Sequence, residues 1–413
     1  MSPVVERFVR YARMDTQSDP DNAASTPSND DELALARTLA QELRQMGVAD
    51  AHSDEHAYVT GHLAASAGAQ GAPCLGLICH IDVSPDACAR GVSPRFARLE
   101  AGRIELGVQD DGASVVVDAG NTPDLAEVPE GAEVVCTDGS TLLGADDKAG
   151  VAEVMELVAR LCADPSIPHP ALAICFAPDE EIGHGCSLLD LEAFGADEAY
   201  TVDGGPIGEV NYETFNAASV TVRFRGRSIH PGSAKGVMVN ALHLAEEFDA
   251  ALPAWERPEH TQGREGFYHL HGLSGTCESA TSRYIIRDHD DASFERRKRL
   301  MQSVAELMNE RLGQPRVSCE VVDEYRNMAR GMESHMDLVD DARSAFHACG
   351  IEPRVIPVRG GTDGAQLTTR GLPCPNLSAG GFNFHSVREF VPVRSLETMV
   401  DVLERLVGLR ARA

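Results

Sequence analysis

The chain has 413 residues, 43% of them hydrophobic, so it is long enough for two domains with large buried cores. Its 64 acidic and 36 basic residues give a net charge of −28, which argues against nucleic acid or an anionic membrane as a partner. No signal-peptide core or membrane-spanning run is present and the 11 cysteines form no C-x-x-C pair, so we expect a cytoplasmic protein with free thiols.

The first 80 residues predict two helices followed by two strands. A short amphipathic helix at 4–9 precedes a polar loop at 18–29, and a second helix runs from about 30 to 46. An alternating strand at 58–63 follows. The next strand, at 75–79, is continuously apolar, which is typical of a strand buried on both faces.

Three apolar strands are each followed by side chains that can bind a metal ion. The strand at 75–79 leads into His80 and Asp82, and two further strands lie at 171–177 and 199–202. The acids that follow these two strands are Glu180, Glu181 and Asp203. Open α/β sheets carry their sites at the carboxyl ends of strands, so these positions predict one shared site. For any one segment alone, a solvated turn is the simpler interpretation.

The turn at 137–150, TDGSTLLGADDKAG, places Asp146 and Asp147 directly before an apolar helical pattern. A carboxylate in this position can bridge two cations, because each of its oxygens can bind a different ion. The alternative is a helix N-terminus that is acidic for capping and dipole reasons.

From about residue 217 the pattern becomes β-α-β-β-α-β, the order of a split-βαβ, ferredoxin-like sandwich. We predict an inserted α+β domain at 216–327 within a discontinuous catalytic domain, 1–215 and 328–413. The fold class is α/β, with a mixed sheet between helices. After the insertion we expect a helix at 335–349, strands at 354–358 and 375–378, and a closing helix from 395 to about 411.

Motifs spread from about residue 7 to 391 resemble the peptidase T family, the tripeptide aminopeptidases among the M20 zinc metallopeptidases. They are RFVRYARMDTQS, HIDVSPD, TLLGADDKAGVAEVM, FAPDEEIGHG, AYTVDGGPIGEVNYETFNAASV, HPGSAKGVMVNAL, YIIRDHD, VRGGTDGAQL, GLPCPNLSAGGFNFH and EFV. TLLGADDKAG together with DEEIGHG is specific to M20-type enzymes. HPGSAKGVMVNA together with RGGTDGAQL points to the peptidase T branch, in which the inserted domain is a lid and dimerisation domain.

The resemblance implies two Zn²⁺ ions per subunit, bridged by Asp146. His80 and Asp203 complete one metal site, and Glu181 and His385 complete the other. Imidazole and carboxylate groups are good zinc ligands, and a water or hydroxide bridging two zinc ions is a strong nucleophile.

The resemblance also implies catalytic roles for two further acids. Glu180 is the general base in hydrolysis of the N-terminal peptide bond of tripeptides. Asp82 orients His80, since a metal-bound imidazole usually donates its second N–H to a carboxylate. We interpret Asp147 as a structural residue that caps the following helix.

Substrate contacts are expected from the inserted domain and the turn at 359–364. The resemblance implies that His230 donates a hydrogen bond to the scissile carbonyl across a homodimer formed through the inserted domain. Asn240, Arg287 and Arg359 are predicted to bind the terminal carboxylate or a carbonyl oxygen of the peptide. The alternatives are a surface turn for the histidine and a domain-internal ion pair for each arginine.

Two other enzyme classes and one non-enzyme class compete with this interpretation. A related M20 dipeptidase or N-acyl-amino-acid deacylase shares the same ligands. A metal-binding scaffold on this fold has no use for Glu180. A serine hydrolase is disfavoured because no G-x-S-x-G elbow is present.

Val387 and the acidic loop at 18–29 depart from the peptidase T pattern and bear on how the free amino end is held.

Overall fold

The computed structural model describes residues 1–108, 112 and 114–412, and the chain divides into two compact units. Unit 1 comprises Met1–Tyr212, Arg330–Ile356 and Thr362–Ala413, and unit 2 comprises Glu213–Ala329 with Pro357–Gly361. The short segment Pro357–Gly361 therefore packs with the inserted unit, although it follows that unit by some thirty residues in the chain.

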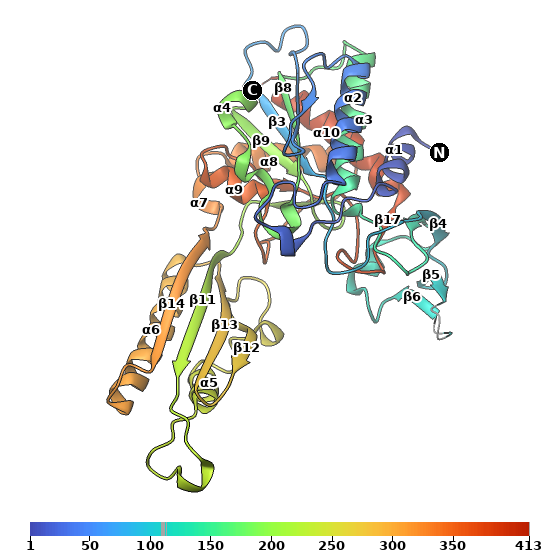
Figure 1. Ribbon diagram of the computed structural model, residues 1–413. Coiled ribbons are helices and arrows are strands. Elements are labelled where there is room, and N and C mark those ends of the chain that lie inside the picture. The colour runs from blue at the N-terminus through green and yellow to red at the C-terminus, as the bar shows by residue number, and fades with distance from the viewer. Residues whose placement is uncertain (109–111, 113, 413) are drawn as a thin grey trace. The chain divides into compact units, whose positions relative to one another are not determined.

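An eight-stranded sheet forms the centre of unit 1, in the order β1-β2-β8-β3-β9-β16-β10-β15. Three of its strands, β8, β3 and β9, are labelled side by side in Figure 1. Its strands are β1 (His52–Ser53), β2 (Val59–Leu63), β3 (Leu75–His80), β8 (Leu172–Ala177), β9 (Glu198–Val202), β10 (Glu209–Asn211), β15 (Arg354–Val355) and β16 (Asn376–Leu377). β3 pairs in parallel with both β8 and β9, so the carboxyl ends of these three strands meet. Every residue of the three strands is buried, as their continuous apolar runs predict.

One predicted strand is shorter than expected. The sequence predicts a strand at 354–358, but β15 ends at Val355. Pro357 has no backbone N–H to donate to a neighbouring strand, so regular pairing stops before it.

Helices cover both faces of this sheet. On one face lie α1 (Pro3–Ala12), α2 (Glu32–Met46), α3 (Ala145–Ala163), α8 (Met336–Ala348) and α10 (Val393–Arg410). The other face is covered by α4 (Leu191–Phe194) and α9 (Asp363–Thr369), whose Phe194 and Leu367 pack with Ile78 of β3. α2 ends at Gly47, which has φ 118°, a left-handed conformation that favours glycine.

Unit 1 also contains two small sheets. They are formed by β4 (Arg95–Arg98), β7 (Glu133–Cys136) and β17 (Phe390–Pro392), and by β5 (Arg103–Val108) and β6 (Ser114–Asp118). The stacked rings of Phe382 and Phe390, 4.9 Å apart, pack into the core of this region. Phe382 and Phe390 also exchange two backbone hydrogen bonds, so the loop between them is closed at its base.

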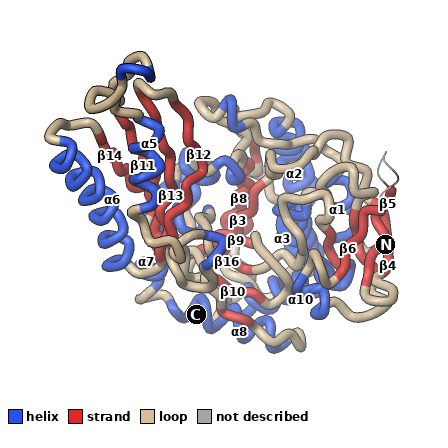
Figure 2. Tube along the Cα trace, turned by 90° about the horizontal axis from the view of Figure 1, so that it is seen from below, coloured by secondary structure: helices blue, strands red, loops and turns tan. Residues whose placement is uncertain are grey.

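Unit 2 is a four-stranded antiparallel sheet with two helices packed against it (Figure 2). Its elements are β11 (Asn216–Arg225), α5 (Ala241–Ala250), β12 (Phe267–Gly275), β13 (Ser279–Asp288), α6 (Asp291–Leu312) and β14 (Val317–Tyr325). The strand order β12-β13-β11-β14 confirms the predicted split-βαβ topology. Val220 and Phe224 of β11 are buried against Phe248 of α5 and Phe294 of α6, whereas Arg223 between them is exposed.

All 11 cysteines are free thiols. Among the helices of the described residues, none has the length and apolar character needed to cross a membrane.

Candidate metal centre

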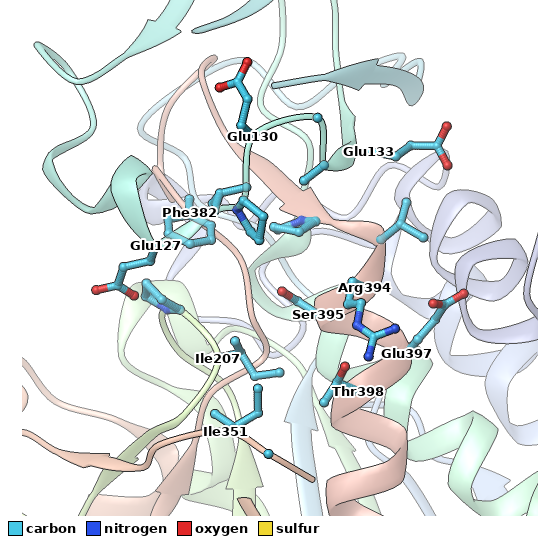
Figure 3. A pocket seen from close by; sticks show the side chains of 18 of the residues that line it. Glu127, Glu130, Glu133, Ile207, Ile351, Phe382, Arg394, Ser395, Glu397 and Thr398 are labelled. Atoms are coloured by element: carbon cyan, nitrogen blue, oxygen red, sulfur yellow. The ribbon is translucent and has the colours of Figure 1, made fainter. Parts of the chain in front are cut away.

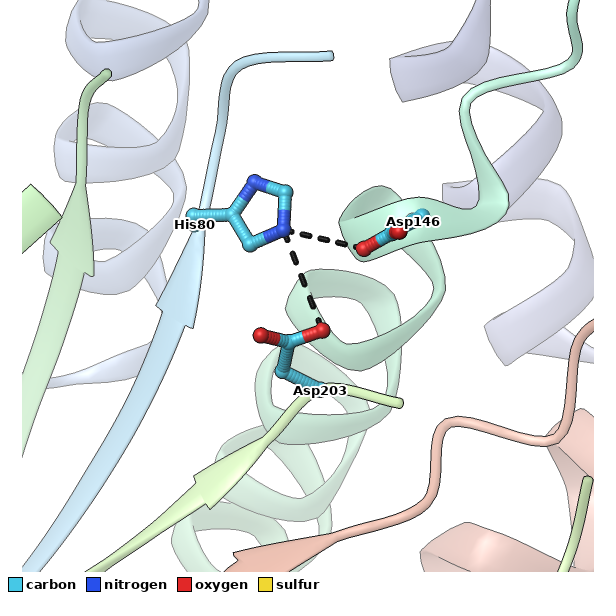
Figure 4. A group of neighbouring side chains, drawn as sticks. All are labelled: His80, Asp146 and Asp203. Atoms are coloured by element: carbon cyan, nitrogen blue, oxygen red, sulfur yellow. Dashed lines mark hydrogen bonds and ion pairs between the residues drawn. The ribbon is translucent and has the colours of Figure 1, made fainter. Parts of the chain in front are cut away.

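The structure places the five predicted metal ligands in two adjacent groups that share Asp146. In the first group, the Nε2 atom of His80 lies 3.0 Å from Asp146 Oδ1 and 3.8 Å from Asp203 Oδ1 (Figure 4). In the second group, the Nε2 atom of His385 lies 3.4 Å from Asp146 Oδ2 and 3.0 Å from Glu181 Oε2. The potential ligand atoms of each group lie within 4.8 Å of one another. The two oxygens of Asp146 thus face different groups.

Parallel strand ends bring most of these residues together. His80 is the last residue of β3, and Asp203 directly follows β9, its neighbour in the sheet. Glu180 and Glu181 lie in a 3-10 turn after β8, on the other side of β3. The sheet order β8-β3-β9 therefore explains why residues far apart in the sequence converge.

The backbone of Asp146 and Asp147 is not helical, although α3 begins around them. Asp147 accepts hydrogen bonds from the backbone N–H of Gly150 at 3.1 Å and of His80 at 3.3 Å. Asp147 therefore contacts the first turn of α3, as we expected of a structural residue. A Cβ atom on Gly150 would lie only 1.9 Å from the carbonyl oxygen of Val202, so glycine is required where α3 passes the end of β9.

Asp82 contacts both His80 and the Glu180-Glu181 turn. Its Oδ1 lies 3.3 Å from His80 Nδ1, and its two oxygens accept the backbone N–H groups of Glu180 at 3.0 Å and Glu181 at 3.1 Å. It also accepts a hydrogen bond from the hydroxyl of Ser18. Asp82 is fully buried. His80 Nδ1 also lies 3.1 Å from the backbone carbonyl oxygen of Asp82, so this one residue contacts the histidine ring and the acidic turn beside it, and its orienting role stays a prediction.

Glu389, to which the sequence analysis assigned no role, holds the backbone around Asp146. Its carboxylate accepts four consecutive backbone N–H groups at 2.7, 2.7, 2.7 and 3.1 Å. The donors are Leu143, Gly144, Ala145 and Asp146. Glu389 lies in the same closed loop as His385, so it links that loop to the turn that carries Asp146. In the sequence, the indication of this role was the position of Glu389 in the EFV segment, four residues after the predicted ligand His385.

Asp86 is a second residue for which the sequence analysis proposed no role. Its Oδ2 lies 3.1 Å from Nδ1 of His385, on the side of the ring opposite Glu181 and Asp146. The only signal in the sequence was its position four residues after Asp82 in HIDVSPD.

The electrostatics of the centre are those of several acids sharing a small volume. Burial raises the pKa of Glu180 and of Asp203 well above the usual range, and it raises that of Glu181 to about 7. Although burial opposes its ionisation, Asp146 has a pKa well below its usual value because both histidines are hydrogen-bonded to it. Hydrogen bonds to Asp146 and Glu181 raise the pKa of His385 to about 11.

The residues present fit a pair of divalent cations. Three carboxylates and two imidazoles are the ligand types that zinc accepts, and they balance much of the charge of two such ions. Glu181 Oε1 is buried and has no hydrogen-bond partner among the described residues. A buried, unpaired carboxylate oxygen is costly unless an ion or a donor satisfies it, so its position supports a metal at the second group.

The predicted substrate contacts all lie in unit 2, where each already has a partner. Asn240 caps α5 by accepting the N–H of Leu242, and His230 lies in an exposed turn and accepts the N–H of Gly232. Arg287 pairs with Glu324 at 3.1 Å. Arg359 donates to Gly263 O, Glu265 O and Thr261 Oγ1. Both arginines thus make the domain-internal contacts that were the alternative interpretation, and their substrate roles stay predictions.

The largest of the pockets described in unit 1 has a volume of about 680 Å³, and none of the candidate metal ligands lines it (Figure 3). Apolar side chains such as Ile207, Ile351 and Phe382 line it, together with the first turn of α10. Glutamates lie around it: Glu127 pairs with Arg354, and Glu130 accepts backbone N–H groups from residues 101 and 102. The side chains that line this pocket do not identify a class of ligand.

Comparison with known proteins identifies relatives over the full length. Residues 212–315 match the family model of the peptidase dimerisation domain. A peptidase T from Caldanaerobacter subterraneus subsp. tengcongensis is 43% identical over 409 residues, which is 99% of each chain. A peptidase T from Vibrio parahaemolyticus is 45% identical over 414 residues, covering 100% of this chain and 99% of the relative.

Solved structures show the same fold. A tripeptidase from Staphylococcus aureus superposes with a TM-score of 0.78 at 20% identity, covering 100% of this chain and 98% of the other. A Bacillus cereus aminopeptidase superposes with a TM-score of 0.77 at 20% identity and the same coverage. A dinuclear metal-binding peptidase of the M20 family from Bacillus subtilis has a TM-score of 0.65 at 11% identity, covering 98% of this chain and 97% of the other.

Proposed function

This chain belongs to the peptidase T family of M20 peptidases, and we propose that it is a dinuclear zinc aminopeptidase that releases the N-terminal residue of tripeptides. The observation that carries the proposal is the pair of ligand groups that share Asp146, with Glu180 beside them. His80, Asp146 and Asp203 would hold one ion, and Asp146, Glu181 and His385 the other. When bound, the two ions would acidify a water molecule and stabilise negative charge on the scissile carbonyl oxygen.

Glu180 supplies the proton transfers in this proposal. Its carboxylate takes a proton from the attacking water as the new C–O bond forms, and donates it to the amine nitrogen as the C–N bond breaks. Without metal ions, burial and the nearby Asp203 raise the pKa of Glu180, whereas the charge of two bound cations would favour the carboxylate that the first proton transfer needs. A carboxyl group with a raised pKa can hold the proton between these two steps near neutral pH.

The proposal is tested by metal restoration and a substrate panel. We expect chelator-treated protein to be inactive and Zn²⁺ to restore cleavage of the first peptide bond of tripeptides. Activity restored only by Mn²⁺ or Co²⁺ would contradict zinc. Cleavage of dipeptides or N-acetyl amino acids in place of tripeptides would favour the alternative M20 dipeptidase or deacylase.

Glu180→Gln tests the base. We expect it to keep both ions and to lose about 10²–10⁴-fold in kcat, the usual contribution of a general acid–base group. Glu192→Gln, at an exposed acid in α4, is the matched control and should have wild-type activity. Near-full activity of Glu180→Gln would show that the base lies elsewhere.

We also propose a cytoplasmic homodimer formed through the inserted domain. The match of residues 212–315 to the peptidase dimerisation domain supports the dimer, and the free cysteines support a reducing compartment. If His230 acts in the active site of the partner, mixing inactive His230→Ala and Glu180→Gln proteins should restore activity in the heterodimer. No restoration, with heterodimers demonstrated by light scattering and differential tagging, would place both residues in one subunit's site.

A further inference from the structure

We propose that Asp86 is a positioning residue that holds His385 in its ligand orientation, as Asp82 does for His80. This proposal rests on the metal-dependent function above. The contact is between Asp86 Oδ2 and His385 Nδ1, at 3.1 Å. It leaves Nε2, the other ring nitrogen, facing Glu181 and Asp146.

His385 needs such a partner more than His80 does. The His80 ring is 1% exposed and belongs to a buried strand, so packing limits its rotation. The His385 side chain is 42% exposed and its backbone lies at φ 60°, in a loop between Phe382 and Phe390. A carboxylate on Nδ1 fixes both the tautomer and the plane of an imidazole that would otherwise rotate.

The loop that carries Asp86 is itself held in place. Gln17 Nε2 donates to the carbonyl oxygens of Ser84 at 2.9 Å and Ala87 at 2.6 Å, on both sides of Asp86. The carbonyl of Cys88 accepts the N–H of Leu142 at 2.9 Å. The backbone on each side of Asp86 is therefore fixed, which limits where its short side chain can reach.

The expected contribution of Asp86 is modest, because its side chain is 67% exposed and water competes for the hydrogen bond. Removing a carboxylate that supports a metal-bound histidine typically costs about 10–100-fold in metal affinity. We expect Asp86→Ala to lie near the lower limit, about 10-fold, for one of two bound ions. Asp86→Asn keeps an oxygen that can accept the Nδ1–H, so it should recover most of the loss.

Zinc affinity measured by chelator competition tests the role directly, on full-length wild type, Asp86→Ala and Asp86→Asn. The control is Asp164→Ala, whose carboxylate bonds to Ser166 away from the site. We expect one weakened ion in Asp86→Ala, recovery in Asp86→Asn and no change in the control. In zinc-loaded, ¹⁵N-histidine-labelled protein, the slowly exchanging Nδ1–H signal of His385 should disappear in Asp86→Ala alone.

Two outcomes would overturn the role in distinguishable ways. Wild-type affinity for both ions in Asp86→Ala would overturn the positioning role and leave the proposed function intact. Failure of the wild-type protein to bind two ions would overturn the proposed function, and this role with it. Equal losses in Asp86→Ala and Asp86→Asn, without recovery, would show that the negative charge rather than hydrogen bonding matters and would also overturn it.

Discussion

The two ligand groups of the metal centre are built in different ways. The His80 group lies at the ends of two buried strands, and its orienting carboxylate, Asp82, is 0% exposed. The His385 group depends on a loop, and its histidine and the supporting Asp86 are 42% and 67% exposed. Both histidines present Nε2 to the shared Asp146 and Nδ1 to an aspartate.

The same hydrogen-bonding pattern can therefore be obtained from a rigid core or from a surface loop. Core packing limits rotation of the buried His80 ring in the absence of metal, whereas the 42% exposed His385 ring depends more on its contacts with Asp86, Asp146 and Glu181. We expect the ion at the His80 group to bind more tightly and exchange more slowly, because its ligands lose less conformational freedom on binding.

Removing the residue shared by both groups should have the largest effect. Asp146→Asn keeps the shape of the side chain but lacks the charge that faces both histidines. We expect it to lose both ions. The loss of several kcal/mol of transition-state stabilisation corresponds to roughly 10³-fold or more in kcat/KM. Metal analysis and a tripeptide assay measure this, and retention of one tightly bound ion would contradict a shared ligand.

Substituting each histidine in the metal-free protein tests whether the His80 group is more deeply buried in the fold than the His385 group. His80→Ala removes the buried imidazole that contacts Asp82, Asp146 and Asp203, which should cost about 3–5 kcal/mol in the free energy of unfolding. His385→Ala lets water reach Asp146 and Glu181, so we expect about 1 kcal/mol or less. Urea denaturation with chelator present measures both, and equal costs would contradict the difference between the groups.

Glu389 connects the two groups, so its removal should affect both. Glu389→Gln replaces one acceptor oxygen with an NH₂ group that faces buried N–H donors. With unpaired buried donors costing about 1–3 kcal/mol each, we expect a loss of about 2–4 kcal/mol in unfolding free energy and weaker binding of both ions. Glu133→Gln, at an exposed acid of β7, is the control. Weakening of one ion only would show that Glu389 acts on one group.

We expect the smallest effect on the free energy of unfolding from a histidine–aspartate pair outside the metal centre. His62 Nδ1 lies 2.7 Å from Asp50 Oδ2, the same arrangement as His385 and Asp86 but remote in the fold. Although burial acts in the opposite direction on each, mutual hydrogen bonding raises the pKa of His62 and lowers that of Asp50. Both side chains are about half exposed, so the pair should contribute less than about 1 kcal/mol.

The sign of each pKa shift defines the pH window of this contribution. The raised His62 pKa gives stability that is complete below about pH 6.5 and is lost as pH rises through the folded pKa. The lowered Asp50 pKa gives stability that is complete above about pH 4 and is lost as pH falls through the folded pKa. The difference in unfolding free energy between wild type and Asp50→Asn should therefore peak near pH 5–6. Metal affinity should not change, and a change would contradict the separation of this pair from the centre.

Much of the architecture could be predicted from local patterns. Continuous apolar runs identified β3, β8 and β9, and the β-α-β-β-α-β order identified the topology of unit 2. The positions of His80, Glu181 and Asp203 after such runs were enough to expect them near one another, because parallel strands align their carboxyl ends.

The supporting contacts could not be predicted in this way. Glu389 bonds to backbone N–H groups more than 240 residues earlier, and a carboxylate in a chain with 64 acidic residues carries no sign of such partners. Arg287 and Arg359 have the residue type of a carboxylate-binding site, yet their observed partners lie within unit 2. A side chain's type limits what it can bind, but its neighbours decide which of those contacts it makes.

Periodicity and residue type, which act over a few neighbouring residues, predicted the buried strands β3, β8 and β9 and the topology of unit 2. The resemblance of the motifs to peptidase T completed the set of candidate ligands. Only the tertiary structure decided which oxygen of Asp146 faces which histidine. It also decided that Asp86 contacts His385 and that Glu389 accepts backbone N–H groups around Asp146. The physical reason is that a hydrogen bond requires its two atoms to lie about 3 Å apart in a suitable direction. Between segments hundreds of residues apart, only the packed tertiary structure sets that distance.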